Sequence, residues 1–223
     1  NSGQQDRSQG RGEPPVQGRL HVIGNEVTDH GAVFAADQSR CDVVADGENE
    51  HQQATGAEHA VADLRNILDD KSVDAVVIAA CDHWHAPAAI LACEAGKHVY
   101  VEWPLGRTTA EAVEMADLAR SKGVRTLVGL QARAAPGILY AKELVDTGYV
   151  GQVMSCHVSL IREGGLQRTS DRTWQRDDSL GANTLTIACG HTIDALRFVL
   201  GNFGHVSTVV STQAKQWLDT DTQ

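Results

Sequence analysis

The feature that most constrains the fold is a regular alternation of short apolar runs with stretches of helical periodicity. Residues 74–80 (DAVVIAA) form a continuous apolar run, the pattern of a strand buried on both faces of a parallel sheet. A helix is predicted over residues 85–95, ended by Gly96, and the next strand over residues 98–102. Because parallel strands need a crossover, usually a helix, this order predicts an α/β fold with a Rossmann-type doubly wound parallel sheet.

The same alternation extends on both sides of this run. Thr108, three residues before Glu111, predicts a helix with a capping box, and Gly123 predicts its end. Further strands are predicted at residues 19–24, 41–45 and 124–130, and further helices at residues 31–39 and 60–68. We therefore expect a Rossmann-type domain over residues 19–133. It follows a polar, flexible arm, residues 1–18, which lacks the apolar segment of a secretory signal.

From residue 134 the pattern changes. The remaining elements are a helix at 138–146, a strand at 152–161, a Gly-, Arg- and Asp-rich loop at 162–181, a helix at 191–200 and a strand at 205–213. This order predicts a second, shortened α+β domain with an antiparallel sheet over residues 134–223. So few strands neither cover a sheet face nor protect its edges. We expect either more chain or a partner chain to complete the sheet, and a partner chain implies a homo-oligomer through this domain.

The composition excludes several classes of partner. The chain has 19 Lys and Arg against 29 Asp and Glu, a net charge of −10 at pH 7. Such a surface repels phosphate backbones and anionic lipids, so neither nucleic acid nor a membrane is expected as a partner. No apolar run approaches the ~20 residues of a membrane-spanning helix. Five scattered cysteines without CxxC spacing predict reduced thiols in a cytoplasmic protein.

Three spaced sequence motifs identify a family resemblance. They are VDAVVIAACDHWHAPAAILACEAGKHVYVEWPL, GVRTLVGLQARAAPGILYAKELVDTGYVGQV and GHTIDALRFVLG, in this order. The chain resembles the glucose-fructose oxidoreductase and inositol dehydrogenase family (Gfo/Idh/MocA), and its EWPL, LQAR and GHTID segments look closest to the fungal galactose-pathway repressor branch. The resemblance implies a small-molecule substrate and an NAD(P) cofactor. In the repressor branch it implies a dinucleotide-binding regulator without turnover.

The phosphate-binding turn departs from the family pattern. The family's first strand runs into G-x-G-x-x-G, whereas here only Gly24 is kept, and Glu26 and Asp29 replace the second and third glycines. At ~5 Å and an effective dielectric constant of ~20, each carboxylate facing a phosphate costs about 3 kcal/mol. We therefore expect no cofactor, or NAD(P) only if the altered turn still binds it. Asp46 ends the second strand, either as a ribose-binding acid or as a solvated strand-end residue.

The positions that the resemblance marks as catalytic are changed as well. The family's Glu-Lys-Pro motif supplies a lysine, but this chain has Glu102, Trp103 and Pro104, and an indole exchanges no proton at neutral pH. Ile187 replaces the acid that normally precedes the remaining histidine, His191. His191 is either a general acid or base or a structural histidine. Trp103 either stacks on a ligand ring or fills the space of a lost nicotinamide.

Other polar side chains follow the predicted strands at the edge where open α/β sheets bind ligands. The expected substrate-binding residues are His83, His85, Glu102, Trp103, Gln131 and Arg133. Arg133 either binds a carboxylate or phosphate with its fork or is an ordinary surface arginine. Asp82, His83 and His85 lack a further ligand at suitable spacing, so no metal is expected. The loop side chains Arg162, Arg168, Arg172, Trp174 and Arg176 either cover the cleft as a lid or are solvated.

Three functions remain open. The first is a divergent small-molecule enzyme that no longer transfers hydride. It would carry out acid–base or shape-driven chemistry, such as isomerisation, elimination, decarboxylation or cyclisation, with His191 as the proton shuttle. The second is an NAD(P)-dependent oxidoreductase of a sugar-like or carbonyl substrate. The third is a regulatory binding protein without turnover.

Overall fold

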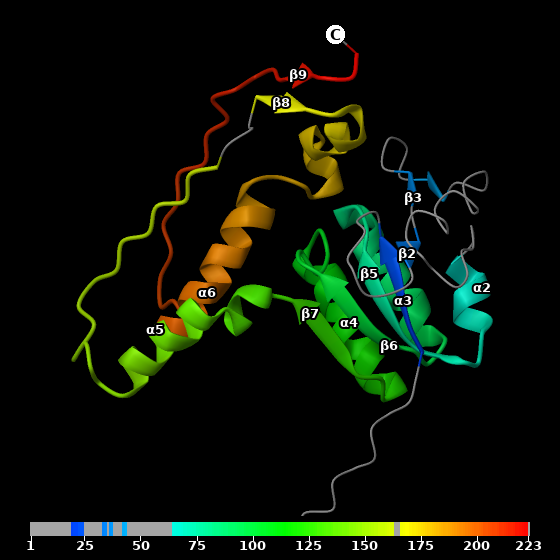
Figure 1. The fold of residues 1–223 in the computed structure, drawn as a ribbon, viewed down its shortest axis with the longest axis horizontal. Coiled ribbons are helices and arrows are strands. Elements are labelled where there is room, and N and C mark those ends of the chain that lie inside the picture. Colours follow the sequence, from blue (N-terminus) through cyan, green and yellow to red (C-terminus); the bar gives the residue numbers. More distant parts are fainter. Residues whose placement is uncertain are drawn as a thin grey trace, which may run out of the picture.

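The main sheet is parallel throughout and has the strand order β2-β1-β5-β6-β7 (Figure 1). The computed structural model describes residues 19–24, 33–34, 36–37, 42–43, 64–162 and 166–222. The strands of this sheet are β1 Arg19–Gly24, β2 Val33–Phe34, β5 Val73–Ala79, β6 His98–Glu102 and β7 Thr126–Gly129. The predicted Rossmann-type parallel sheet is therefore confirmed.

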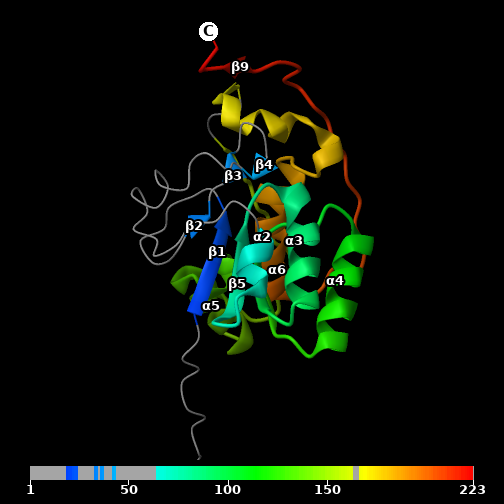
Figure 2. The same cartoon turned by 90° about the vertical axis from the view of Figure 1, so that its right-hand side faces the viewer.

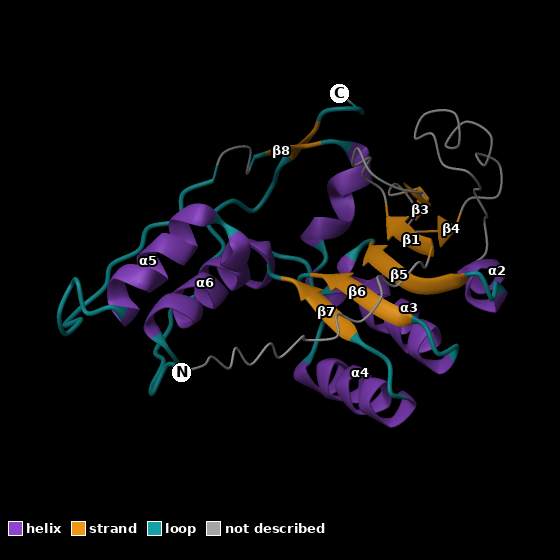
Figure 3. Ribbon diagram, turned by 60° about the horizontal axis from the view of Figure 1, so that its bottom comes forward, coloured by secondary structure: helices purple, strands orange, loops and turns teal. Residues whose placement is uncertain are grey.

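Helices α3 and α4 lie along the same side of this sheet (Figure 3). The helices of this part are α2 Leu64–Asp69, α3 Asp82–Glu94 and α4 Thr109–Lys122. Small residues of α3, such as Ala89 and Ala92, pack against Val76 and Ile78 of β5 and Val101 of β6 in one buried cluster. Alternate residues of β5 are only half-buried, so β5 is less completely buried on its second side than its apolar run predicts.

The start of α4 holds the turn that follows β6. Thr108 Oγ1 accepts a hydrogen bond from the Glu111 backbone N–H at 3.2 Å, and Gly123 ends the helix at φ 67°. The predicted cap and stop residues are therefore confirmed. The Glu111 carboxylate accepts from the backbone and guanidinium of Arg107 at 2.7–3.0 Å, so this side chain also fixes the chain just before the helix.

The second part of the chain is mainly helical. Helices α5 Pro136–Asp146 and α6 Gly190–Leu200 pack on each other beyond β7 (Figure 1). Short helical turns connect them to the rest: η2 Gln131–Ala134, η3 Ser170–Arg176, η4 Asp178–Leu180 and η5 Leu185–Cys189. The one sheet described here joins β8 Gln167–Arg168 to β9 Leu218–Asp219, and its strands are parallel. The predicted antiparallel sheet is therefore wrong.

Two predicted strands of the second part, residues 152–161 and 205–213, are also wrong. Both segments are extended, but neither has a ladder partner among the described residues. Met154, Ile161 and Val209 are 85%, 91% and 95% exposed. An alternating apolar pattern makes a strand only where a neighbour supplies hydrogen bonds and a covering face. Both segments run from the α5–α6 pair to the β8–β9 pair, and the second forms the outer edge of the molecule in Figure 2.

The N-terminal predictions have mixed outcomes. The helix predicted over residues 31–39 is wrong where the structure describes it. β2 adds to the edge of β1, and β3 Ala36–Asp37 pairs with β4 Asp42–Val43. The predicted arm, residues 1–18, lies outside the described residues. In the part of the chain that the structure describes, every helix is too short or too polar to cross a bilayer.

Candidate functional site at the carboxyl edge of the sheet

His85 joins the carboxyl ends of the two central strands. Ile78 of β5 pairs with Val101 of β6, so the residues that follow both strands reach the same edge. The His85 ring is 1% exposed, with Nδ1 2.5 Å from the Pro104 carbonyl oxygen and Nε2 2.9 Å from that of Ala80. Burial lowers its pKa, while both carbonyls act in the opposite direction. This predicted substrate-binding side chain bridges two loops inside the protein.

Asp82 and His83, directly beside this bridge, carry polar atoms with no internal partner. Among the described residues, Asp82 Oδ2 and His83 Nδ1 are buried and have no hydrogen-bond partner. Asp82 is 5% exposed, and burial raises its pKa to about 7. Burial, followed by the positive field of Arg107, lowers the pKa of His83. A carboxyl group that titrates near neutrality is therefore present at the sheet edge, although the sequence offered no signal for its pKa beyond its position.

Trp103 connects this edge to the start of α6. Its indole Nε1 donates to the Thr186 carbonyl oxygen at 2.7 Å, and its ring lies 6.5 Å from that of His191 in an edge-to-face arrangement. The ring also lies against Gly190, where an added methyl group would come within 2.8 Å of the Trp103 Cε2 atom. Trp103 therefore fills the space in front of α6, and its only polar atom is already bonded.

Arg133 is engaged with α6 rather than open. Its Nε and Nη2 donate to the Asp194 carboxylate at 2.7 and 2.5 Å, and its guanidinium lies 5.6 Å from the centre of the Phe198 ring. The hydrogen bonds from Arg133 lower the pKa of Asp194. The geometry is a bidentate fork on an internal carboxylate. The structure thus gives Arg133 a positioning contact between η2 and α6.

Of the remaining predicted residues, some are exposed and others lie outside the described part of the chain. Gln131 and Glu102 are exposed. Gly24 ends β1, whereas Glu26, Asp29 and Asp46 lie outside the described residues. Within the described ranges, no group of three or more His, Cys, Asp or Glu side chains converges as a metal site would require.

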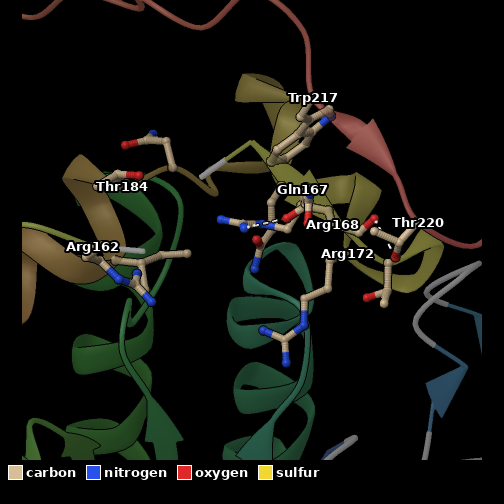
Figure 4. A pocket seen from close by; sticks show the side chains of 11 residues that line it. Arg162, Gln167, Arg168, Arg172, Thr184, Trp217 and Thr220 are labelled. Atoms are coloured by element: carbon tan, nitrogen blue, oxygen red, sulfur yellow. Dashed lines mark hydrogen bonds between the residues drawn. The ribbon is translucent and has the colours of Figure 1, made fainter. Parts of the chain in front are cut away.

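A second feature is a cavity of about 520 Å³ above the sheet, between η3, η5 and the β8–β9 pair (Figure 4). Arg162, Arg168, Arg172 and Trp217 line it, with amide and hydroxyl side chains around them. Sequence reasoning identified the three arginines only as parts of a loop, and their close spacing is the signal that points here. It missed Trp217 and the polar residues Gln167, Gln175, Asn183 and Thr184, which no motif marks.

The fold and this edge define an α/β protein with a Rossmann-type sheet and a second, helical part that closes over the carboxyl ends of its strands. Residues 22–130 match the family model "Oxidoreductase family, NAD-binding Rossmann fold", and residues 136–223 match the model "Gal80p, C-terminal domain". The chain belongs to the Gfo/Idh/MocA oxidoreductase family, as its motifs predict.

Individual relatives show the same relationship. The chain is 34% identical to the levoglucosan dehydrogenase of Pseudarthrobacter phenanthrenivorans over 70% of this chain and 40% of that protein. It is 27% identical to the galactose/lactose metabolism regulatory protein GAL80 of Saccharomyces cerevisiae over 63% of this chain and 34% of that protein. A solved levoglucosan dehydrogenase in complex with NADH and levoglucosan has a TM-score of 0.66 at 23% identity, covering 83% of this chain and 55% of that one. The matches therefore span about half or less of these relatives.

Proposed function

We propose that the chain forms the ligand site of a small-molecule enzyme built on an oxidoreductase scaffold, in which acid–base chemistry replaces lysine-assisted hydride transfer. His191 is the proposed proton shuttle, and Asp82 is the second titratable group at the same edge of the sheet. The ligand is proposed to bind at the carboxyl ends of β5 and β6, as is usual for open α/β sheets.

The placement of Trp103 is the observation that supports this proposal. The indole stands in the motif position of the family lysine, donates its N–H to Thr186 and covers Gly190. It therefore offers no proton to a ligand. His191 lies next to this ring, and the Asp82 carboxyl has a pKa raised to about 7 by burial. A pKa near the working pH suits a group that both gives and accepts a proton.

A nicotinamide-dependent oxidoreductase is the second candidate. The unpartnered Asp82 Oδ2 and His83 Nδ1 fit a ligand rich in hydroxyl and amide groups, as the ribose and nicotinamide of NAD(P) are. Asp82 and His83 would hold that end of the cofactor, and NAD(P) when bound supplies a hydride acceptor. In this case the residues of the chain orient the cofactor, and His191 moves the proton of the substrate hydroxyl.

The deciding experiment combines cofactor binding with product analysis. The protein is titrated calorimetrically with NAD⁺, NADH, NADP⁺ and NADPH, after a check for cofactor carried through purification. Its relatives include a levoglucosan dehydrogenase, a D-xylose dehydrogenase and an inositol 2-dehydrogenase. Levoglucosan, D-xylose and inositol are therefore incubated with the protein, with and without cofactor, and products are followed by NMR. His191→Ala is compared with His157→Ala, which changes an exposed histidine.

Each outcome selects one function. Cofactor-independent conversion that is lost in H191A and kept in H157A supports the proposal. Reduction of NAD(P)⁺ coupled to substrate oxidation overturns it in favour of the second candidate. Cofactor or ligand binding without any conversion also overturns it, and supports a regulatory binding protein like the relative GAL80.

A further inference from the structure

We propose that His85, with the carbonyl groups of Ala80 and Pro104, forms a pH-dependent bridge between the loops that follow β5 and β6. As an imidazolium, the His85 ring donates to both carbonyl oxygens. As a neutral imidazole it donates to only one of them, and the other loop is released. This His85 bridge operates in the free protein, so it does not depend on the function proposed above.

Both ring nitrogens of His85 face an oxygen that can only accept a hydrogen bond. Nδ1 lies 2.5 Å from the Pro104 carbonyl oxygen, and Nε2 lies 2.9 Å from that of Ala80. Both distances are short enough for hydrogen bonds. A neutral imidazole has one N–H and one lone pair, so one of the two contacts would bring a lone pair against a carbonyl oxygen. The observed pair of contacts therefore corresponds to the doubly protonated ring.

Burial makes the neutral ring incompatible with this arrangement. His85 is 1% exposed, so bulk water does not reach the ring to separate a nitrogen lone pair from a carbonyl oxygen. A buried acceptor that loses its donor costs about 1–3 kcal/mol. When the ring loses a proton, one of the two loops is therefore expected to move away from it.

The Pro104 carbonyl is the one expected to be released. Ala80 lies five residues before His85, just ahead of the same helix, and the preceding Ala79 pairs with Gly24 of β1. Pro104 lies 19 residues from His85, on the turn after the end of β6. The less local contact costs more chain entropy to keep. We therefore expect the neutral ring to carry its proton on Nε2 and to donate to Ala80.

The charged groups around His85 set the pH at which the bridge changes. They are Asp82 and His83 on α3, Glu102 at the end of β6 and Arg107 before α4. Burial lowers the pKa of His85, whereas the two carbonyls and then the Glu102 carboxylate favour the imidazolium. Burial, then Arg107 and His85, lower the pKa of His83. The bridge is therefore expected to form on the acid side of the ordinary histidine pKa of about 6.5.

Trp103 transmits the state of the bridge to the second part of the chain. It directly precedes Pro104, and its indole donates to the Thr186 carbonyl oxygen at 2.7 Å and lies against Gly190 at the start of α6. A shift of Pro104 therefore acts on the contact between the sheet edge and α6. Protonation of His85 is expected to tighten this contact.

The test is an NMR titration of the protein labelled with ¹³C and ¹⁵N, from pH 4 to pH 8 and without ligand. The His85 ring nitrogens report its charge and tautomer, and the Pro104 and Ala80 carbonyl carbons report their hydrogen bonds. As the pH falls, the ring is expected to change from the Nε2–H form to the imidazolium. The Pro104 carbonyl carbon should move downfield with the same midpoint, and that of Ala80 should move much less.

Three results of this titration would overturn the proposal: a His85 ring with one charge state throughout, a neutral ring protonated on Nδ1, or a Pro104 carbonyl that does not follow the ring. None of them requires a variant.

Variants then assign the response to His85. His85→Gln cannot gain a proton and should abolish the pH response of the Pro104 carbonyl. His83→Gln and Asp82→Asn each remove a neighbouring titratable group and should keep the response. A response that persists in H85Q, or that disappears in H83Q or D82N, would contradict the assignment. Circular dichroism checks that each variant is folded, and if H85Q is not, the titration of the unaltered protein decides.

Discussion

Two carboxyl groups of this protein, those of Asp82 and Asp194, are buried. Burial raises the pKa of the Asp82 carboxyl to about 7, and its Oδ2 has no partner in the described structure. The Asp194 carboxylate, in contrast, accepts two hydrogen bonds from Arg133. An unpaired buried carboxyl and a paired one have opposite effects on the free energy of unfolding, and both effects are measurable.

Asp82 is expected to make the protein less stable as the pH rises. Between the ordinary aspartate pKa of about 4 and the raised pKa of about 7, the folded chain holds a proton that the unfolded chain has lost. The free energy of unfolding therefore falls across this window, by about 2 kcal/mol after allowance for solvent screening. Urea unfolding from pH 4 to pH 8 measures this slope.

Asp82→Asn should remove this part of the pH dependence and be more stable than the unaltered protein at pH 8. Asp74→Asn, at an exposed position of β5, serves as the control and should leave the slope unchanged. Parallel pH profiles for D82N and the unaltered protein would show that the Asp82 carboxyl does not titrate in this window.

Arg133→Ala is expected to destabilise the fold by about 2 kcal/mol, because it leaves the Asp194 carboxylate buried without its partner. The Asp194 side chain is only 8% exposed. Arg133→Lys should recover part of the loss, and the double variant R133A/D194A should be less destabilised than the sum of both single changes. Thermal and urea unfolding give these values. Additive losses would mean that the two side chains do not stabilise each other.

At the scale of elements, Trp103 contacts Gly190, the first residue of α6. This contact predicts that the effect of a substitution at Gly190 depends on the residue at position 103. Gly190→Ala should cost about 1–3 kcal/mol, because the added methyl group would collide with the indole. In a Trp103→Ala background the same change should become neutral or stabilising, since Gly190 has helical φ −58° and alanine favours a helix. Urea unfolding of the four proteins checks this change of sign. A similar loss in both backgrounds would contradict the packing.

From residue 64 on, the elements of the Rossmann part could be predicted from sequence because their signals are local, whereas the helix predicted over residues 31–39 was wrong. The strand at residues 98–102 and the cap of α4 at Thr108 depend on neighbouring residues. The strands predicted in the second part failed, since strand formation depends on a partner that no local pattern reveals.

Part of the arrangement at the sheet edge could be predicted from the sequence, whereas its role as a site stays a prediction. Motif spacing brought Trp103 and His191 to one edge. It gave no sign that Arg133 pairs with Asp194, nor that Trp217 faces Arg168, because these contacts join segments far apart in the chain.

At the scale of the whole molecule, the second part exposes large apolar side chains along two extended segments. They include Met154, Ile161, Val206 and Val209, and large exposed apolar side chains are typical of interaction surfaces. We expect the protein to self-associate through these segments. Light scattering coupled to gel filtration should therefore give a mass that rises with concentration, and the melting temperature should rise with it.

Substitution tests whether these segments are responsible. Met154→Asp combined with Val209→Asp should yield a monomer, whereas Val113→Asp, at an exposed position on α4, should not alter the mass. A monomer at all concentrations, or dissociation by V113D as well, would contradict assembly through the extended segments.

The hydrogen bond from Trp103 to Thr186 also has a consequence for the order of folding. It connects residues 83 positions apart, so forming it costs about 1 kcal/mol more loop entropy than closing the crossover from β5 to β6. Contacts with high closure cost tend to form after local ones. The sheet is thus expected to assemble early, and the join between its edge and α6 late. Newly made chains would then pass through a stage in which the scaffold exists before its site does.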